Sequence, residues 1–158
     1  MLDDLYQSLI LDHSARPRNF GPLASASHEA DGFNPLCGDR ITVRVQVEGD
    51  AIVDIAFVGE GCAISKASAS LMTESVRGKG KGEADALFRH FHSLVTGEIR
   101  PPSAPDEQDA AQADEIALGK LEALSGVRGF PMRVKCATLA WHTLQAALSR
   151  QTAPVKTE

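Results

Sequence analysis

The residues of this chain best suited to chemistry are its three cysteines and one aspartate. Cys37 and Asp39 lie two apart in PLCGDR, Cys62 follows a glycine in GEGCAIS, and Cys136 lies in MRVKCATLAW. The sequence has no other cysteine. Three thiolates and one carboxylate supply four ligands, which is the number that zinc takes in a closed tetrahedral site. One metal site built from three separate segments is therefore the first hypothesis.

The neighbours of these residues favour that hypothesis. Pro35 fixes one backbone angle and Gly38 permits a close turn, so Cys37 and Asp39 can lie around a common centre. We expect Cys62 and Cys136 each to begin a helix. The positive end of a helix dipole favours the thiolate form of a cysteine placed there.

A second interpretation stays open at this point. Scattered cysteines in a globular chain are commonly buried as small apolar side chains. The sequence has no CxxC pair, the most specific sequence sign of a zinc site. Spacing alone therefore does not decide between a shared metal site and three separate buried thiols.

A β-hairpin is the clearest secondary structure in the sequence. Apolar and polar residues alternate over 41–48 and again over 53–57, with Gly49 and Asp50 as the turn between them. The chain of an antiparallel hairpin returns to where it began. We therefore expect Cys37, Asp39 and Cys62 to lie close together.

The remaining pattern predicts an α+β fold of one domain over residues 1–150. A short edge strand over 26–33 would join the hairpin in a small three-stranded antiparallel sheet, whose apolar face needs helices to cover it. About five helices are expected, over residues 2–13, 62–76, 83–96, 116–124 and 132–149, with Gly126 ending the fourth. Residues 97–115 are predicted to be an exposed connection, whose role the sequence does not indicate. Residues 151–158 are predicted to be a frayed tail.

Composition excludes several classes of partner. The net charge is −5 and the isoelectric point is near 5.5, so no basic stripe is expected to bind nucleic acid. The odd number of cysteines does not resemble a disulfide framework and fits a reducing compartment, so we expect a cytoplasmic protein. The acidic N-terminal segment does not resemble a signal peptide, and no apolar run is long enough to span a membrane.

Four segments in the same order resemble the IscU/NifU N-terminal family of iron–sulfur cluster assembly proteins, and within it the SufU type. They are LYQSLILDHSARPRNFG, NPLCGD, FVGEGCAIS and RVKCATLAW, and the resemblance covers about residues 2–149. It implies a SufE/NifU-like fold. It also implies that Cys37, Asp39, Cys62 and Cys136 bind the metal and that Cys136 is the catalytic, sulfur-receiving residue.

Three departures from the IscU pattern favour the SufU type. Lys135 stands where IscU proteins have a histidine, the segment between Cys62 and Cys136 is longer, and GFPMRVK replaces the LPPVK stretch that a dedicated Hsp70 chaperone recognises. The resemblance then implies bound Zn²⁺ and persulfide sulfur accepted from a SufS-type cysteine desulfurase. Downstream iron–sulfur assembly proteins or apoproteins would receive the sulfur.

Two alternatives remain beside this sulfurtransferase-like carrier, and whether such a carrier is an enzyme is left open. The same four ligands could hold a [2Fe–2S] cluster or iron on an assembly scaffold, because thiolates suit both metals. The chain could also be a zinc-stabilised interaction module without chemistry.

The carrier hypothesis assigns roles to individual residues. Zinc keeps thiolates deprotonated but reduces their nucleophilicity while they are bound, so a useful site must release one. Asp39, a hard ligand among soft ones, could hold the metal geometry while a thiolate leaves. Arg133 and Lys135 are supporting candidates that would stabilise the freed thiolate or persulfide of Cys136. The alternative for both is a solvated basic start of the helix.

Overall fold

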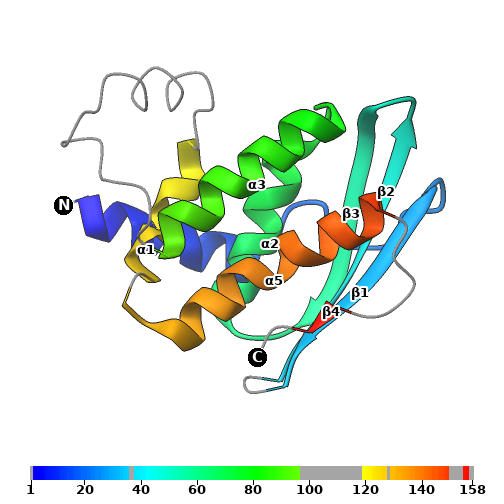
Figure 1. The fold of residues 1–158 in the computed structure, drawn as a ribbon. Helices are drawn as coiled ribbons and strands as arrows, with labels where there is room; N and C mark the ends of the chain where they lie inside the picture. The colour runs from blue at the N-terminus through cyan, green and yellow to red at the C-terminus, as the bar shows by residue number, and fades with distance from the viewer. Residues whose placement is uncertain (1, 36–37, 97–118, 128, 150–154, 157–158) are drawn as a thin grey trace, which may run out of the picture.

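The computed structural model describes residues 2–35, 38–96, 119–127, 129–149 and 155–156. In chain order its elements are α1 (Leu2–Ala15), β1 (His28–Asn34), β2 (Asp39–Glu48), β3 (Ala51–Glu60), α2 (Ala63–Val76), α3 (Lys81–Thr96), the 3₁₀ helix η1 (Gly119–Val127), α5 (Pro131–Leu148) and β4 (Val155–Lys156). The helices lie together on one side of the sheet (Figure 1). This is the α+β architecture expected from the sequence.

The sheet has the order β3-β2-β1-β4. The first three strands pair antiparallel, and the predicted hairpin is confirmed as β2 and β3. The burial of β2 alternates as in a sheet with one covered face, because Ile41, Val43 and Val45 are buried while the residues between them are half-buried.

Two helices, α2 and α5, pack on the sheet and on each other. Helix α5 packs on β1 and β2, and α2 packs on β3 and α5. A buried polar link joins α2 to α5. The Ser68 hydroxyl donates to the carbonyl of Ala137 at 2.5 Å and accepts a hydrogen bond from Trp141 Nε1 at 3.2 Å. This link joins α2 to α5 at Ala137, the residue that follows Cys136.

The fourth helix differs from the prediction. Residues 119–127 form a 3₁₀ helix that includes Gly126, so the expectation that Gly126 ends an α-helix is wrong. Two glycines and a serine in this stretch lower α-helical propensity, and tighter turns are tolerated over short lengths. The predicted connection over 97–115 and the start of the predicted helix at 116–118 lie outside the described residues.

The tail also differs from the prediction at two residues. Val155 and Lys156 were expected to fray, but they form β4, which pairs parallel to β1 at Gly32 and Phe33. The reason is that β1 is otherwise an edge strand whose backbone groups remain available for pairing. Within the described ranges, no helix is both long enough and apolar enough to cross a membrane.

Candidate metal centre

Asp39 is the first residue of β2 and is completely buried. It lies opposite Asn34, the last residue of β1, in the antiparallel register. The predicted tight turn precedes it, because Gly38 has a φ of 73° and its backbone nitrogen donates to the Asn34 carbonyl at 2.8 Å. Cys37, the ligand predicted in the same turn, lies outside the described residues.

Cys62 is the N-cap of α2, as the sequence predicted. Its backbone is extended, and its sulfur accepts a hydrogen bond from the backbone nitrogen of Ser65 at 3.5 Å. The side chain is exposed, so the thiol is accessible from solvent. A cysteine here satisfies one of the N–H groups that a helix start leaves without an intrahelical partner.

A hydrogen bond connects Asp39 to the start of α2. The backbone nitrogen of Cys62 donates to Asp39 Oδ1 at 2.9 Å, and Asp39 Oδ2 lies 4.0 Å from the Cys62 sulfur. This close approach requires Gly61, since a Cβ there would lie 2.5 Å from Asp39 Oδ1. The glycine is therefore part of the site, a role that the sequence analysis did not assign to it.

Cys136 completes the cluster but does not begin a helix, so that expectation is wrong. Helix α5 begins at Pro131, which suits a first helical position because its missing N–H has no intrahelical partner there. Cys136 therefore lies in the second turn, and its side chain is only 3% exposed. The amide nitrogen of Asn34 donates to its sulfur at 3.8 Å.

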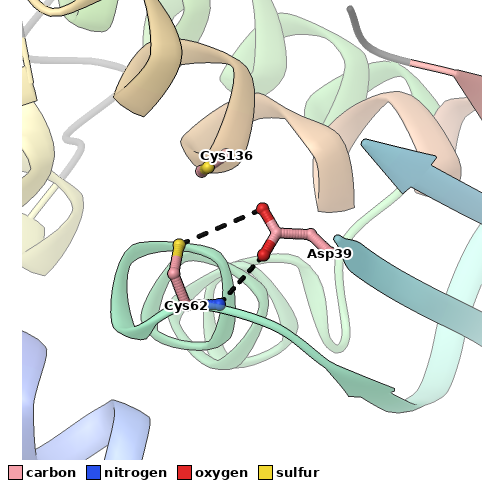
Figure 2. A group of neighbouring side chains, drawn as sticks. All are labelled: Asp39, Cys62 and Cys136. Carbon is pink, nitrogen blue, oxygen red and sulfur yellow. Dashed lines mark hydrogen bonds between the residues drawn. The ribbon is translucent and has the colours of Figure 1, made fainter. Parts of the chain in front are cut away.

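The three described side chains converge on one point (Figure 2). The ligand atoms of Asp39, Cys62 and Cys136 all lie within 4.8 Å of one another. Two sulfur ligands of a tetrahedral zinc, each about 2.3 Å from the metal, are about 3.8 Å apart. A small contraction would thus bring these atoms to coordination distance, and the donor set fits zinc or an iron–sulfur cluster.

The two cysteines also interact electrostatically. A hydrogen bond with Cys136 is the largest factor that lowers the pKa of the Cys62 thiol, from 9.0 to about 6. Partial burial and the nearby charge of Asp39 oppose this effect, and the backbone nitrogen of Ser65 adds to it. This lowered pKa favours the thiolate form of Cys62 at neutral pH, and the thiolate is the form that binds a metal.

The two basic residues predicted to support the site take different positions. The Arg133 guanidinium lies 4.7 Å from the centre of the Phe130 ring in a cation–π contact at the exposed start of α5. Lys135 is half-buried beside Cys136 in the sequence. In this conformation the Arg133 guanidinium is thus held by the Phe130 ring.

Comparison with known proteins identifies the family. The NifU-like N terminal domain family matches residues 5–123. The chain belongs to this family. As a family member it is similar to the zinc-dependent sulfurtransferase SufU of Bacillus subtilis (strain 168), with 42% identity over 150 residues that cover 95% of this chain and 93% of SufU. It is also similar to the iron–sulfur cluster assembly scaffold protein IscU of Streptococcus pyogenes serotype M1, with 44% identity over 94% of this chain and 86% of that protein.

A solved structure of 34% identity agrees with this family membership. A crystal structure of a candidate iron–sulfur cluster assembly scaffold protein for the SUF system, from Fervidobacterium islandicum AW-1, matches with a TM-score of 0.76 and 34% identity. The match covers 89% of this chain and 93% of that one. A NifU-like N-terminal protein from Brucella abortus has the same fold, with a TM-score of 0.75 at 22% identity over 96% of this chain and 99% of that one.

Proposed function

We propose that this protein accepts persulfide sulfur from a SufS-type cysteine desulfurase and carries it to iron–sulfur cluster assembly. The observation that supports this most strongly is the convergence of Asp39, Cys62 and Cys136 within 4.8 Å. The similarity to a relative named as a zinc-dependent sulfurtransferase, over nearly the whole length of both chains, supports the same function.

The metal centre of this proposal consists of Cys37, Asp39, Cys62 and Cys136, with Zn²⁺ as the ion. Zinc at such a site would keep the thiols deprotonated at neutral pH and would stabilise the fold. Asp39 is well suited to be the persistent ligand. Its carboxylate is fully buried, and Oδ1 is held by the Cys62 backbone while Oδ2 faces the sulfurs.

Cys136 is the proposed acceptor. Its thiolate would attack the outer sulfur of the desulfurase persulfide, which forms a new S–S bond on Cys136 and breaks the S–S bond of the donor. The donor cysteine leaves as a thiolate, so no external oxidant or reductant is needed. Because Cys136 is buried, the residues that cover its sulfur would have to move for the donor to reach it. Arg133 and Lys135 precede Cys136 by three residues and one residue, and their positive charges would stabilise the persulfide on Cys136.

A scaffold function is the second candidate. The same soft ligands suit a [2Fe–2S] cluster, and a relative of 44% identity is named as an assembly scaffold. The two functions share the metal centre and differ in the cargo that it holds. Either function fits a reducing compartment such as the cytoplasm, because the thiols must stay free to act.

Desulfurase turnover without iron tests the proposal. A SufS-type desulfurase is assayed alone and with the zinc-loaded protein, and the sulfur attached to each cysteine is mapped by mass spectrometry. The carrier predicts strong stimulation and a persulfide on Cys136, and Cys136→Ser abolishes both. No stimulation without iron, together with a transferable [2Fe–2S] cluster after reconstitution, would establish the scaffold instead.

A further inference from the structure

Asn34 connects two parts of the metal centre that are far apart in the sequence. It is the last residue of β1 and is completely buried. In the sheet register it pairs with Asp39, while its side chain reaches the sulfur of Cys136 on α5. Asn34 thus pairs with one proposed ligand, Asp39, and contacts the sulfur of another, Cys136.

The two contacts of Asn34 use different atoms. Its backbone carbonyl accepts the hydrogen bond from Gly38 that closes the turn before Asp39. Its side-chain amide donates to Cys136 Sγ at 3.8 Å. A substitution of the side chain therefore removes the contact with sulfur and leaves the atom that closes the turn in place.

The sulfurs of Cys62 and Cys136 receive hydrogen bonds from different elements. The Cys62 sulfur receives a backbone N–H from Ser65 at the start of its own helix. Cys136 is the sixth residue of α5, beyond the first turn where free backbone N–H groups and the helix dipole act. Among the described residues, β1 provides a donor to its sulfur, the Asn34 amide.

We propose that Asn34 is a positioning residue of the metal centre, whose amide holds the Cys136 sulfur in ligand position through an N–H···S hydrogen bond. This inference rests on the proposed metal-binding function. Outer-shell donors orient metal ligands and withdraw electron density from a bound sulfur, and they change affinity as well as electronic properties. Asn34 would do so without touching the metal.

The test compares Asn34→Leu with Thr143→Val. Leucine has the same branched side-chain skeleton as asparagine and lacks the donor. Thr143 is buried on α5 against Gly32 of the same strand, so its variant disturbs the β1–α5 packing without removing a contact to sulfur. Zinc affinity is measured by competition with a chelator. Asn34→Leu should lower it by about 10- to 100-fold, and Thr143→Val should leave it near the wild-type value.

A spectroscopic readout separates this role from a general loss of packing. In the cobalt-substituted protein, loss of a hydrogen bond to sulfur raises the energy of the sulfur lone pairs. The sulfur-to-cobalt charge-transfer band should therefore move to longer wavelength in Asn34→Leu and stay in place in Thr143→Val. An Asn34→Leu variant with unchanged affinity and an unchanged band, or equal changes in both variants, would overturn the inference.

A measurement on the wild-type chain tests the inference even if the Asn34→Leu variant does not fold. With the NMR-active isotope of cadmium bound, the Asn34 side-chain amide proton should show a scalar coupling to the metal, transmitted through the hydrogen bond and the sulfur. The absence of this coupling, with an Asn34 amide resonance that does not shift on metal loading, would overturn the inference. Wild-type protein that binds no metal would instead contradict the proposed function itself.

Discussion

The backbone nitrogen of Cys62 donates a hydrogen bond to Asp39 Oδ1 over 2.9 Å, although the two residues are 23 positions apart in the chain. The bond joins the first residue of β2 to the N-cap of α2. It orients the carboxylate so that its second oxygen faces the sulfurs (Figure 2). The hairpin of β2 and β3 therefore brings the two side chains together and also fixes how one is presented to the other.

Asp39→Asn and Asp39→Ala should separate the two roles of this carboxylate. The asparagine retains an oxygen that can accept from the Cys62 backbone, so the free energy of unfolding of the metal-free protein should change little. The alanine loses that bond and should cost about 1 kcal/mol. Both variants should bind zinc more weakly, because both lose the anionic ligand. Chemical denaturation without metal and chelator competition with metal measure the two effects, and equal zinc affinity in all three proteins would contradict the assignment.

Gly61→Ala should weaken the metal centre although residue 61 provides no ligand. The new Cβ would lie 2.5 Å from Asp39 Oδ1, so the carboxylate or the start of α2 must shift. We expect the zinc affinity to fall by about tenfold or more, as for other losses of ligand orientation.

Gly82→Ala is the matched control, since a Cβ at Gly82 on α3 meets no atom within 4 Å. Its zinc affinity should equal that of the wild type. Equal zinc affinities in Gly61→Ala and the wild type would contradict this prediction, because they would show that metal binding does not require the present position of the Asp39 carboxylate.

The hairpin and the proximity of Asp39 to Cys62 could be predicted because both follow from local patterns. Strict alternation defines the strands, and antiparallel pairing returns the chain to its start. The last helix was expected from residue 132 and begins at Pro131, but this start places Cys136 five residues into the helix, so the thiol does not lie at the helix end. The buried amide of Asn34 also could not be found, since its partner is 102 residues away and only tertiary packing brings them together.

The metal-free protein should show an unusually acidic thiol at Cys62. The hydrogen bond with Cys136 lowers the pKa of Cys62 to about 6, so its rate of alkylation by iodoacetamide should rise with pH around a midpoint near 6. The ordinary pKa of a cysteine thiol, and so the expected midpoint without this effect, is 9.0. Peptide mass spectrometry after short reaction times, at a series of pH values, measures this profile.

Cys136→Ala provides the control, because it removes the hydrogen bond and should move the Cys62 midpoint upward. The shift also has a consequence for stability. Because the pKa of Cys62 is lower in the folded state than in the unfolded state, the unfolded chain binds more protons between pH 6 and 9. This thiol's contribution to the free energy of unfolding is therefore complete above about pH 9 and is lost as pH falls toward 6. A wild-type midpoint near that of an ordinary thiol would contradict the geometry.

Metal removal should lower the melting temperature. The ion would tie the turn before β2, the start of α2 and the second turn of α5 together, and it binds the folded state alone. At a free zinc concentration about 1,000 times Kd, binding adds about 4 kcal/mol, which corresponds to about 8–16 °C in Tm for a chain of this size. Calorimetry with and without a chelator measures this change in Tm. Cys136→Ser, which lacks one ligand, should respond much less, and an unchanged Tm in the wild type would mean that the fold does not use the metal.

X-ray absorption at the zinc edge tests the central claim most directly, because it counts the atoms bound to the metal. For protein purified without added metal, we predict about three sulfur neighbours at about 2.3 Å and one oxygen at about 2.0–2.2 Å. Cys62→Ser and Cys136→Ser should each lose one sulfur, and Asp39→Ala should lose the carboxylate oxygen. A zinc shell with no sulfur, or a sulfur count that neither cysteine variant changes, would contradict a metal centre at Asp39, Cys62 and Cys136.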